Sequence, residues 1–143
     1  MKNNDILNAK RILNEDNYTL VLCNDDKLYT DCERGVKPLL KFISGNINLK
    51  GFSAADKVVG RAAAFLYVIL EVEEVYAEVM SKTAVDVFGR YGIKFSYDVQ
   101  TETIQNREGT GICPMEQATK DAENPIQALN FVKDALAALS EPG

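Results

Sequence analysis

The sequence predicts an α/β fold of three layers, in which a mixed sheet carries helices on both faces. Tyr18–Cys23 and Lys27–Asp31 are rich in β-branched and aromatic residues and flank a turn at Asn24–Asp26, which is the pattern of an N-terminal hairpin. Later strands are reached through helical segments, which is typical of parallel strand pairs. The segment 50–70 reads as a helix that is apolar around almost its whole circumference, so other elements must cover it.

The remaining elements follow from hydrophobic spacing. Apolar residues at positions i, i+3, i+4 and i+7 predict an amphipathic helix from Val36 that Gly45 ends, and Ile93–Gln100 alternates apolar with polar residues as a half-buried strand near an edge does. Val75–Met80 is apolar enough to be an interior strand. Further helices are expected over 5–14, 81–92, from Pro114 onward and from Asn124 to Leu139.

Length and charge limit the class of protein. The chain has 143 residues, a net charge of −5 and a pI of about 4.8, and we expect a single domain over 1–143. Its lysines are dispersed, so the electrostatic pattern of a general nucleic-acid binder is missing, and a small-molecule or protein partner is expected instead. Its longest apolar run is far shorter than the roughly 20 residues that span a bilayer. Three widely spaced cysteines predict free thiols in a cytoplasmic protein.

The first candidate site lies at the predicted start of the central helix. Ser53 stands at the expected N-cap and Asp56 three residues later, which is the spacing of a capping box, so a purely structural role explains both residues. Lys57 opposes the helix dipole, which would make sense beside a bound anion, although a solvated lysine explains it too. Asp56, Lys57 and Arg61, with Gly60 between them, form the only polar strip on the predicted helix.

Two further helix starts carry candidate residues. Ser81, Lys82 and Thr83 open the helix after the interior strand, with Thr83 and Asp86 again at capping-box spacing. The third start follows a loop that contains Gly109 and Gly111 and ends in Cys113, a plausible cradle for an anion, although most such loops merely turn. In the next helix, Glu116 is first a carboxylate that the helix dipole favours.

Cys113 is the candidate nucleophile. A thiol at a helix N-terminus is held more readily as a thiolate, so Cys113 could act as a nucleophile or a redox-sensitive group. The chain contains no histidine, so a base would have to be a carboxylate such as Asp56, a lysine or the ligand itself. A simple capping or packing role for Cys113 is the alternative, and Cys23, within a strand, is expected to pack in the core.

The order of elements resembles the cytidine-deaminase-like fold, in which two helix N-termini meet over the active site. In addition, Gly51–Gly60 (GFSAADKVVG) and Gly109–Gln117 (GTGICPMEQ) are similar to the two signature stretches of an uncharacterised bacterial and archaeal domain family that shares this fold. The resemblance covers nearly the whole chain, and it implies a pocket where the helix starts converge.

Zinc-dependent deamination is not implied by this resemblance. The deaminase motifs place a His or Cys one residue before a general-acid Glu on the first helix and Pro-Cys-x-x-Cys on the second, and these residues hold the zinc that activates water. Here the corresponding stretches are Ser53–Lys57 and Ser81–Val85, which contain none of these ligands. We therefore expect neither a metal nor a cofactor.

The function predicted from the sequence is the binding of a small anionic or nucleotide-like molecule at three converging helix starts. The residues expected to line the pocket are Ser53, Asp56, Lys57, Ser81, Lys82, Thr83, Gly109, Gly111 and Cys113. The alternative is a metal-free enzyme in which Cys113 is the nucleophile and Asp56 or Lys57 assists proton transfer. A third hypothesis is an interaction domain that forms a homo-oligomer through a strand edge or an apolar helix face.

Overall fold

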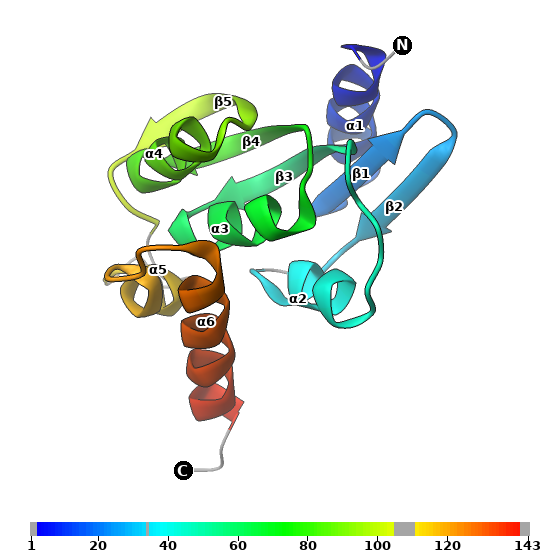
Figure 1. Cartoon of the computed structure of the whole chain (residues 1–143). Helices are drawn as coiled ribbons and strands as arrows, with labels where there is room; N and C mark the ends of the chain where they lie inside the picture. Colours follow the sequence, from blue (N-terminus) through cyan, green and yellow to red (C-terminus); the bar gives the residue numbers. More distant parts are fainter. Residues whose placement is uncertain (1–2, 34, 105–110, 141–143) are drawn as a thin grey trace.

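The computed structural model describes residues 3–33, 35–104 and 111–140, and its strands within these ranges form one five-stranded sheet (Figure 1). The strand order across the sheet is β2-β1-β3-β4-β5. The elements are α1 (Asn3–Glu15), β1 (Leu20–Asn24), β2 (Lys27–Asp31), α2 (Lys37–Ser44), β3 (Ser53–Val59), α3 (Arg61–Leu70), β4 (Glu74–Ser81), α4 (Lys82–Tyr91), β5 (Lys94–Thr101), α5 (Pro114–Thr119) and α6 (Pro125–Ser140).

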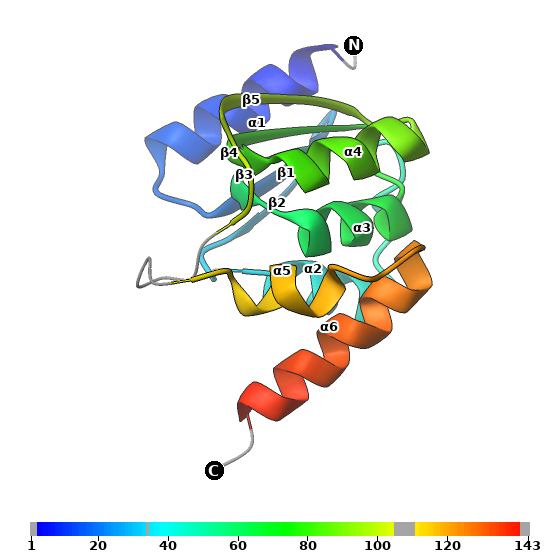
Figure 2. The same ribbon diagram turned by 90° about the vertical axis from the view of Figure 1, so that its left-hand side faces the viewer.

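The strand pairing confirms the mixed sheet. β1 pairs antiparallel with both β2 and β3, whereas β4 pairs parallel with both β3 and β5. The predicted hairpin is therefore β1–β2, and α3 is the crossover of a parallel strand–helix–strand unit. α1 lies on one face of the sheet, and α2, α3 and α4 lie on the other (Figure 2). The three-layer α/β architecture is confirmed.

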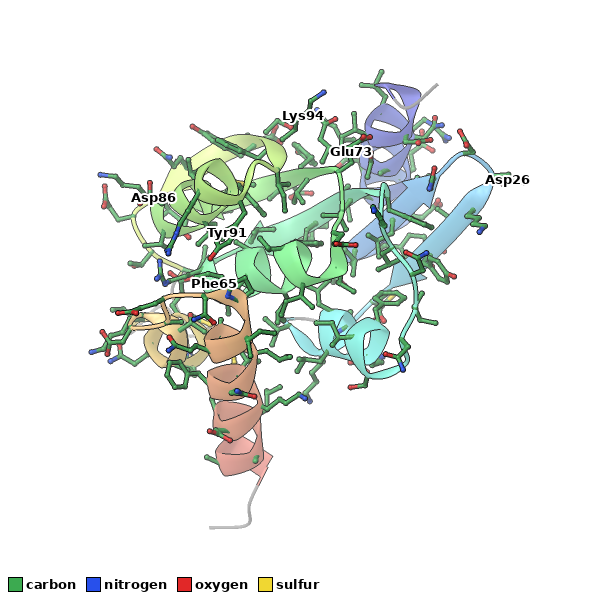
Figure 3. All side chains as sticks on the ribbon, viewed as in Figure 1. Asp26, Phe65, Glu73, Asp86, Tyr91 and Lys94 are labelled. Carbon is green, nitrogen blue, oxygen red and sulfur yellow. The ribbon has the colours of Figure 1, made fainter. Side chains whose placement is uncertain are left out.

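α3 is the central helix of the larger core. Seven of its ten residues are buried, as a helix that is apolar on most sides requires. Rings connect it to α4, because Phe65 and Tyr91 meet edge to face with centroids 6.3 Å apart (Figure 3). A smaller cluster, which includes Leu13, Val21 and Tyr76, holds α1 on the opposite face.

The predicted beginning of the central helix is wrong. Ser53–Val59 forms strand β3, and the helix starts only at Arg61, after Gly60. Ser-Ala-Ala-Asp-Lys has good helix propensity, but this segment pairs with β1 on one side and β4 on the other. The long-range pairing overrides the local preference, so the capping box predicted for Ser53 and Asp56 does not exist.

The three parallel strands change the direction of their side chains at one row. Within the described residues, Lys57, Glu78 and Asp98 are the positions at which β3, β4 and β5 do not pair with one another. Before and after this row, each strand pairs with its neighbour in the same register. Strict alternation would place Val58 on the face of Ala54 and Val59 on the opposite face, with Ala55. Instead Val58 is 46% exposed, and Val59 is fully buried in the cluster of Ala54. Val58, Val79 and Val99 are cross-strand neighbours in the row that follows.

The two C-terminal helices continue the layer that contains α3. α6 packs on α3 and α5 through Ala128 and Val132, and its carboxyl end points away from the sheet (Figure 1, Figure 2). Among the described residues, no helix combines the length and apolar character that crossing a bilayer requires.

Candidate functional site

Two long helices begin at the same edge of the sheet. α3 follows β3 through its N-cap Gly60, and α4 follows β4 through its N-cap Ser81. Because β3 and β4 are parallel, their carboxyl ends lie side by side, and ligands of open α/β sheets bind at this edge. The convergence of helix starts predicted from the sequence is therefore present for α3 and α4.

The carboxylate of Glu116, from α5, lies between these two helix starts. One oxygen, Oε1, accepts a hydrogen bond from the backbone N–H of Arg61, the first residue of α3. The other, Oε2, accepts from the hydroxyl of Thr83 in α4 at 3.3 Å. Glu116 is only 6% exposed. A buried carboxylate here is stabilised by the dipole of α3 and by an N–H that has no partner within its own helix.

Hydroxyl groups of α4 continue the network around Glu116. The Ser81 and Thr83 hydroxyl oxygens are 2.9 Å apart, and Ser81 Oγ accepts from the N–H of Ala84 at 3.1 Å. Ser81 is thus the N-cap of α4, which corrects the capping box predicted for Thr83 and Asp86. Thr83 is free to face Glu116 because Ser81 fills the capping role.

Gly60 leaves the space that Glu116 occupies. A β-carbon at Gly60 would lie 2.9 Å from Cγ1 of Ile104 and in closer collision with Oε1 of Glu116. The φ angle of Gly60 is −103°, so the backbone itself would accept other residues. Glycine is needed at this position because α5 packs too close for a side chain. The ability of glycine to adopt positive φ angles is not required here.

Arg61 holds α5 from the other side. Its Nε donates to the carbonyl of Thr119 at 2.8 Å, and its Nη2 donates to the carbonyl of Ala122 at 2.6 Å. These carbonyls lie at and just after the carboxyl end of α5, where a cation is favoured. The first residue of α3 is therefore bound to α5 twice, through its backbone to Glu116 and through its guanidinium group to the end of the helix.

Cys113 and Lys82 lie at the expected helix starts. Cys113 is the N-cap of α5, but its side chain makes no capping hydrogen bond and packs, half-buried, against the core. Its backbone N–H donates to the carbonyl of Ile104 at 2.8 Å. Lys82 is exposed at the first position of α4, and Gly111 is exposed two residues before Cys113. Gly109 lies outside the described residues.

Three predicted site residues lie on β3, away from the starts of α3 and α4. Ser53 begins the strand, about 23 Å from Gly60 at ~3.3 Å per residue. Its buried hydroxyl has no partner within the described part of the chain. Asp56 lies in the middle of the strand, between Leu20 and Ala77. Lys57 Nζ forms an ion pair with Glu78 at 2.7 Å. Within the described part of the chain, no hydrogen bond or ion pair joins these residues to Glu116 or Cys113.

Asp56 is half-buried and instead forms a pair with the fully buried Tyr67 of α3. The Tyr67 hydroxyl donates to the Asp56 carboxylate at 2.6 Å, and the N–H of Val58 donates at 3.4 Å. Burial raises the pKa of Asp56 to about 7, although these hydrogen bonds and one from the N–H of Lys57 act to lower it. Burial and the neighbouring carboxylate both raise the pKa of Tyr67. The carboxyl therefore takes up or loses a proton near neutral pH.

Sequence reasoning missed the partners that matter most. Tyr67 had one usable signal, since a tyrosine hydroxyl inside an otherwise apolar helix needs a hydrogen-bond partner when it is buried. Glu116 was recognised only as a carboxylate at its own helix start. Its contacts with Arg61 and Thr83 join residues 55 and 33 positions apart, and no local pattern reports such a contact.

The described residues contain no cluster of three or more His, Cys, Asp or Glu side chains that could hold a metal ion. The chemistry available at the edge of β3 and β4 is that of hydrogen-bond donors and one carboxylate. Hydrogen-bond donors of this kind are complementary to negatively charged or polar groups.

Residues 8–136 match the family described as TM1506, a domain of unknown function (DUF1893). No curated protein matches the chain. A solved DUF1893 family protein from Thermotoga maritima shares 26% identity with a TM-score of 0.85, over 92% of this chain and 89% of that one. The family resemblance inferred from the sequence is thus confirmed.

Two deaminases are more distant structural neighbours. The apo dCMP deaminase of cyanophage S-TIM5 has a TM-score of 0.42 at 12% identity, over 70% of this chain and 96% of that one. A diaminohydroxyphosphoribosylaminopyrimidine deaminase/5-amino-6-(5-phosphoribosylamino)uracil reductase from Thermotoga maritima has a TM-score of 0.43 at 9% identity, over 82% of this chain and 40% of that one. At these scores, no activity is transferred to this chain.

Proposed function

Since the chain belongs to the DUF1893 family of domains of unknown function, we propose that it binds a small anionic or nucleotide-like molecule at the starts of α3 and α4. One observation carries the proposal: this place already binds a carboxylate of the chain itself. Glu116 receives the N–H of Arg61 and the hydroxyl of Thr83, and a carboxylate or phosphate oxygen of a ligand would receive the same two donors.

In this proposal Glu116 is an internal occupant that a ligand replaces. The backbone N–H groups at the start of α3 and the hydroxyl of Thr83 are the donors, and exposed Lys82 adds a positive charge at the neighbouring helix start. Ser81 orients Thr83, and Cys113 supplies a half-buried, weakly polar wall. Ser53, Asp56 and Lys57 were expected from the sequence to line the pocket. Their contacts lie along β3, so they are not among these donors.

Replacement of Glu116 by alanine tests the site directly. The Glu116→Ala variant leaves the Arg61 N–H and the Thr83 hydroxyl without their acceptor, which costs roughly 1–3 kcal/mol of unfolding free energy. We expect acetate or formate to restore part of the lost melting temperature, while chloride at equal ionic strength does not. A variant that carboxylates do not stabilise would contradict the proposal.

The ligand class is tested on the unmodified protein and on Glu116→Gln. Nucleotides, sugar phosphates and small carboxylates are added in turn, and the melting temperature is measured by thermal shift. We expect at least one class to stabilise the protein, with a larger shift in Glu116→Gln because the competing charge is gone. Lys57→Ala, whose ion pair lies on β3, is the control and retains the shift, whereas Lys82→Ala and Thr83→Val reduce it. Equal shifts in all variants would count against this site.

The alternative proposal is a metal-free enzyme with Cys113 as nucleophile, helped by Asp56 or Lys57. It rests on the position of Cys113 at the start of α5, since Asp56 and Lys57 contact Tyr67 and Glu78 instead. Iodoacetamide labelling discriminates between the two proposals, because a nucleophilic Cys113 would react faster than exposed Cys32 at pH 6 to 7. All three cysteines are unpaired, which supports the proposal that the domain works in the cytoplasm.

A further inference from the structure

β5 is an edge strand that the rest of the domain leaves largely uncovered. It is the last strand in the order β2-β1-β3-β4-β5, and its residues are exposed from Lys94 to Gln100 (Figure 1, Figure 2). Phe95, Tyr97 and Val99 are large side chains that are 36%, 39% and 56% exposed. A strand edge that displays apolar side chains and contains neither proline nor glycine is a template for pairing with another strand.

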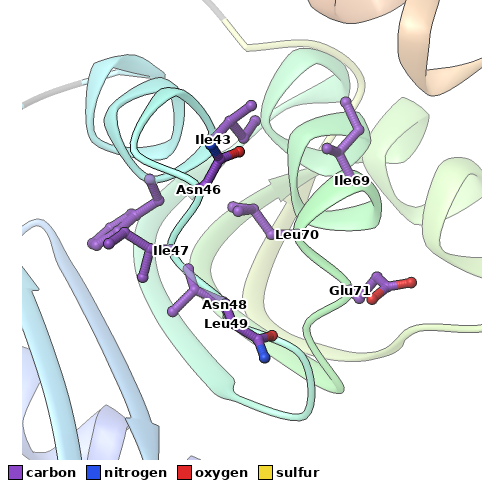
Figure 4. A pocket seen from close by; sticks show the side chains of 9 residues that line it. Ile43, Asn46, Ile47, Asn48, Leu49, Ile69, Leu70 and Glu71 are labelled. Atoms are coloured by element: carbon purple, nitrogen blue, oxygen red, sulfur yellow. The ribbon is translucent and has the colours of Figure 1, made fainter.

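The opposite edge strand, β2, is covered on one face. The ring of Tyr29 meets the rings of Phe42 and Phe52, with centroids 5.4 and 5.8 Å apart. Phe42 also lines the open hollow between the ends of α2 and α3 (Figure 4), so this hollow lies on the β2 side of the molecule, away from β5. α1, on the other face of the sheet, packs mainly on β1, β3 and β4. Both α1 and α2 therefore leave the free edge at β5 open.

The backbone groups of β5 alternate in direction. The N–H of Lys94 donates to the carbonyl of Glu73 at 3.3 Å, so Lys94 directs its backbone groups toward β4. In a regular strand every second residue does so, and the residues between them direct their N–H and C=O groups to the other side. Phe95 and Tyr97 therefore present two donors and two acceptors to a strand that approaches the free edge.

Two opposite charges lie on one face of β5. The carboxylate of Asp98 accepts from the hydroxyl of Tyr76 at 2.5 Å, and Tyr76 belongs to the cluster beneath α1. Lys94 is exposed four residues earlier, on the same face by strand alternation (Figure 3). Among the described residues, no ion pair joins Lys94 to Asp98. Each charge is therefore available to a strand outside the chain.

We propose that two copies of this chain form a dimer by antiparallel pairing of their β5 strands, with the two-fold axis at Ser96. In this register Lys94 of each copy lies opposite Asp98 of the other, and Phe95 lies opposite Tyr97. The Phe95–Tyr97 pairs exchange backbone hydrogen bonds, and the Lys94–Asp98 pairs are the closely spaced kind without hydrogen bonds. Opposite charges and aromatic pairs in these positions stabilise a sheet, and a two-fold interface contains each pair twice.

The charges select this register over its neighbours. An axis at Tyr97 would place Lys94 opposite Gln100, without an opposite charge. An axis at Asp98 would place two carboxylates opposite each other, which is destabilising. With the axis at Ser96, both charged residues meet their complement, and the two five-stranded sheets join into one.

Sedimentation equilibrium of the full chain over a range of concentrations tests the dimer. We expect a reversible equilibrium of monomer and dimer. Lys94→Glu places a carboxylate opposite Asp98 of the second copy and should raise the dissociation constant about tenfold, the equivalent of ~1.4 kcal/mol. The double variant Lys94→Glu/Asp98→Lys restores opposite charges and should recover most of the affinity.

Lys27→Glu is the matched control, because Lys27 is exposed on the other edge strand and its replacement changes the net charge equally. It should leave the dissociation constant unchanged. A chain that stays monomeric at every concentration, or a dimer that Lys94→Glu does not weaken more than Lys27→Glu, would overturn the proposal. Neither result depends on the ligand proposed for the Glu116 site.

Cross-linking locates the axis itself. Opposite residues without hydrogen bonds in an antiparallel pair have Cα atoms ~4.5 Å apart, which is within the range that a disulfide bridges, ~4.4–6.8 Å. With exposed Cys32 replaced by serine, mild oxidation should join two Ser96→Cys chains, whereas Lys27→Cys chains should remain single. Cross-linking of Ser96→Cys that is no faster than that of Lys27→Cys would refute an axis at Ser96.

Discussion

At the scale of single residues, the hydrogen-bonded pair of Asp56 and Tyr67 makes stability depend on pH. The pKa of Asp56 is raised from 3.8 to about 7 in the folded protein. Between about pH 4 and 7 the folded protein therefore keeps a proton that the unfolded chain has lost. The free energy of unfolding falls as the pH rises through this window, and the contribution of Asp56 to stability is greatest below it.

Asp56→Asn should abolish this dependence. At pH 8 we expect the variant to be more stable than the unmodified protein by roughly 2–4 kcal/mol, because the amide never has to ionise in a buried place. At pH 4 the two proteins should differ little. Urea unfolding at both pH values measures the effect, and Asp26→Asn in the exposed hairpin turn is the control (Figure 3). A pH dependence that is unchanged in Asp56→Asn would refute the assignment.

Residue identity alone was enough to select Asp56 and Glu116 as groups of interest. It was insufficient to assign their partners, because Tyr67 and Arg61 reach them through contacts between different elements. Ser53 and Asp56 do have the spacing of a capping box. The same residues form a strand, however, because β1 and β4 pair with them on both sides.

At the scale of elements, the junction of α3 and α5 depends on the missing side chain of Gly60. Gly60→Ala places a methyl group against Glu116 and Ile104, so α5 has to shift, at a cost of roughly 1–3 kcal/mol. Chemical denaturation measures this cost.

Gly89→Ala is the matched control for this prediction, since nothing lies within 4 Å of a β-carbon at that position in α4. Alanine in an exposed helix interior should stabilise the protein by roughly 0.5–1 kcal/mol. The two substitutions are chemically identical, so opposite signs would establish the close approach at Gly60. Equal effects at both positions would argue against it.

Most elements could be predicted from their spacing, and the one error has a physical cause. The hairpin, α2, β4, α4 and α6 have hydrophobic periods that match their conformation. β5 is the edge strand that its alternation predicted, but it is exposed along almost its whole length and not half-buried. The period of β3 does not match its conformation, because Ala54 and Ala55 have strong helix propensity and the row at Lys57 interrupts strict alternation. Its strand character depends on β1 and β4 alone.

At the scale of the whole molecule, the sheet separates two cores of unequal size. Leu66 lies in the large cluster around α3, and Leu13 lies in the small cluster beneath α1, and both are fully buried. Leu66→Ala should lower global stability by roughly 2–5 kcal/mol. Leu13→Ala should instead release α1 first, because α1 packs mainly on β1, β3 and β4 at its own face of the sheet.

Amide hydrogen exchange distinguishes these outcomes. In Leu13→Ala, protection should fall in α1 while β3 and β4 keep theirs, and in Leu66→Ala it should fall throughout the chain. Simultaneous loss of protection everywhere in Leu13→Ala would mean that the two cores unfold as one unit.

The common row at Lys57, Glu78 and Asp98 also restricts how this domain can evolve. The alternation of side chains changes at the same row in three adjacent strands. Deleting one residue from any of these strands would therefore shift its register relative to its neighbours and exchange the side chains on its two faces. Changes in length should therefore be confined to the connections between strands. Homologous chains should therefore vary in the side chains of these strands far more readily than in the lengths of the strands.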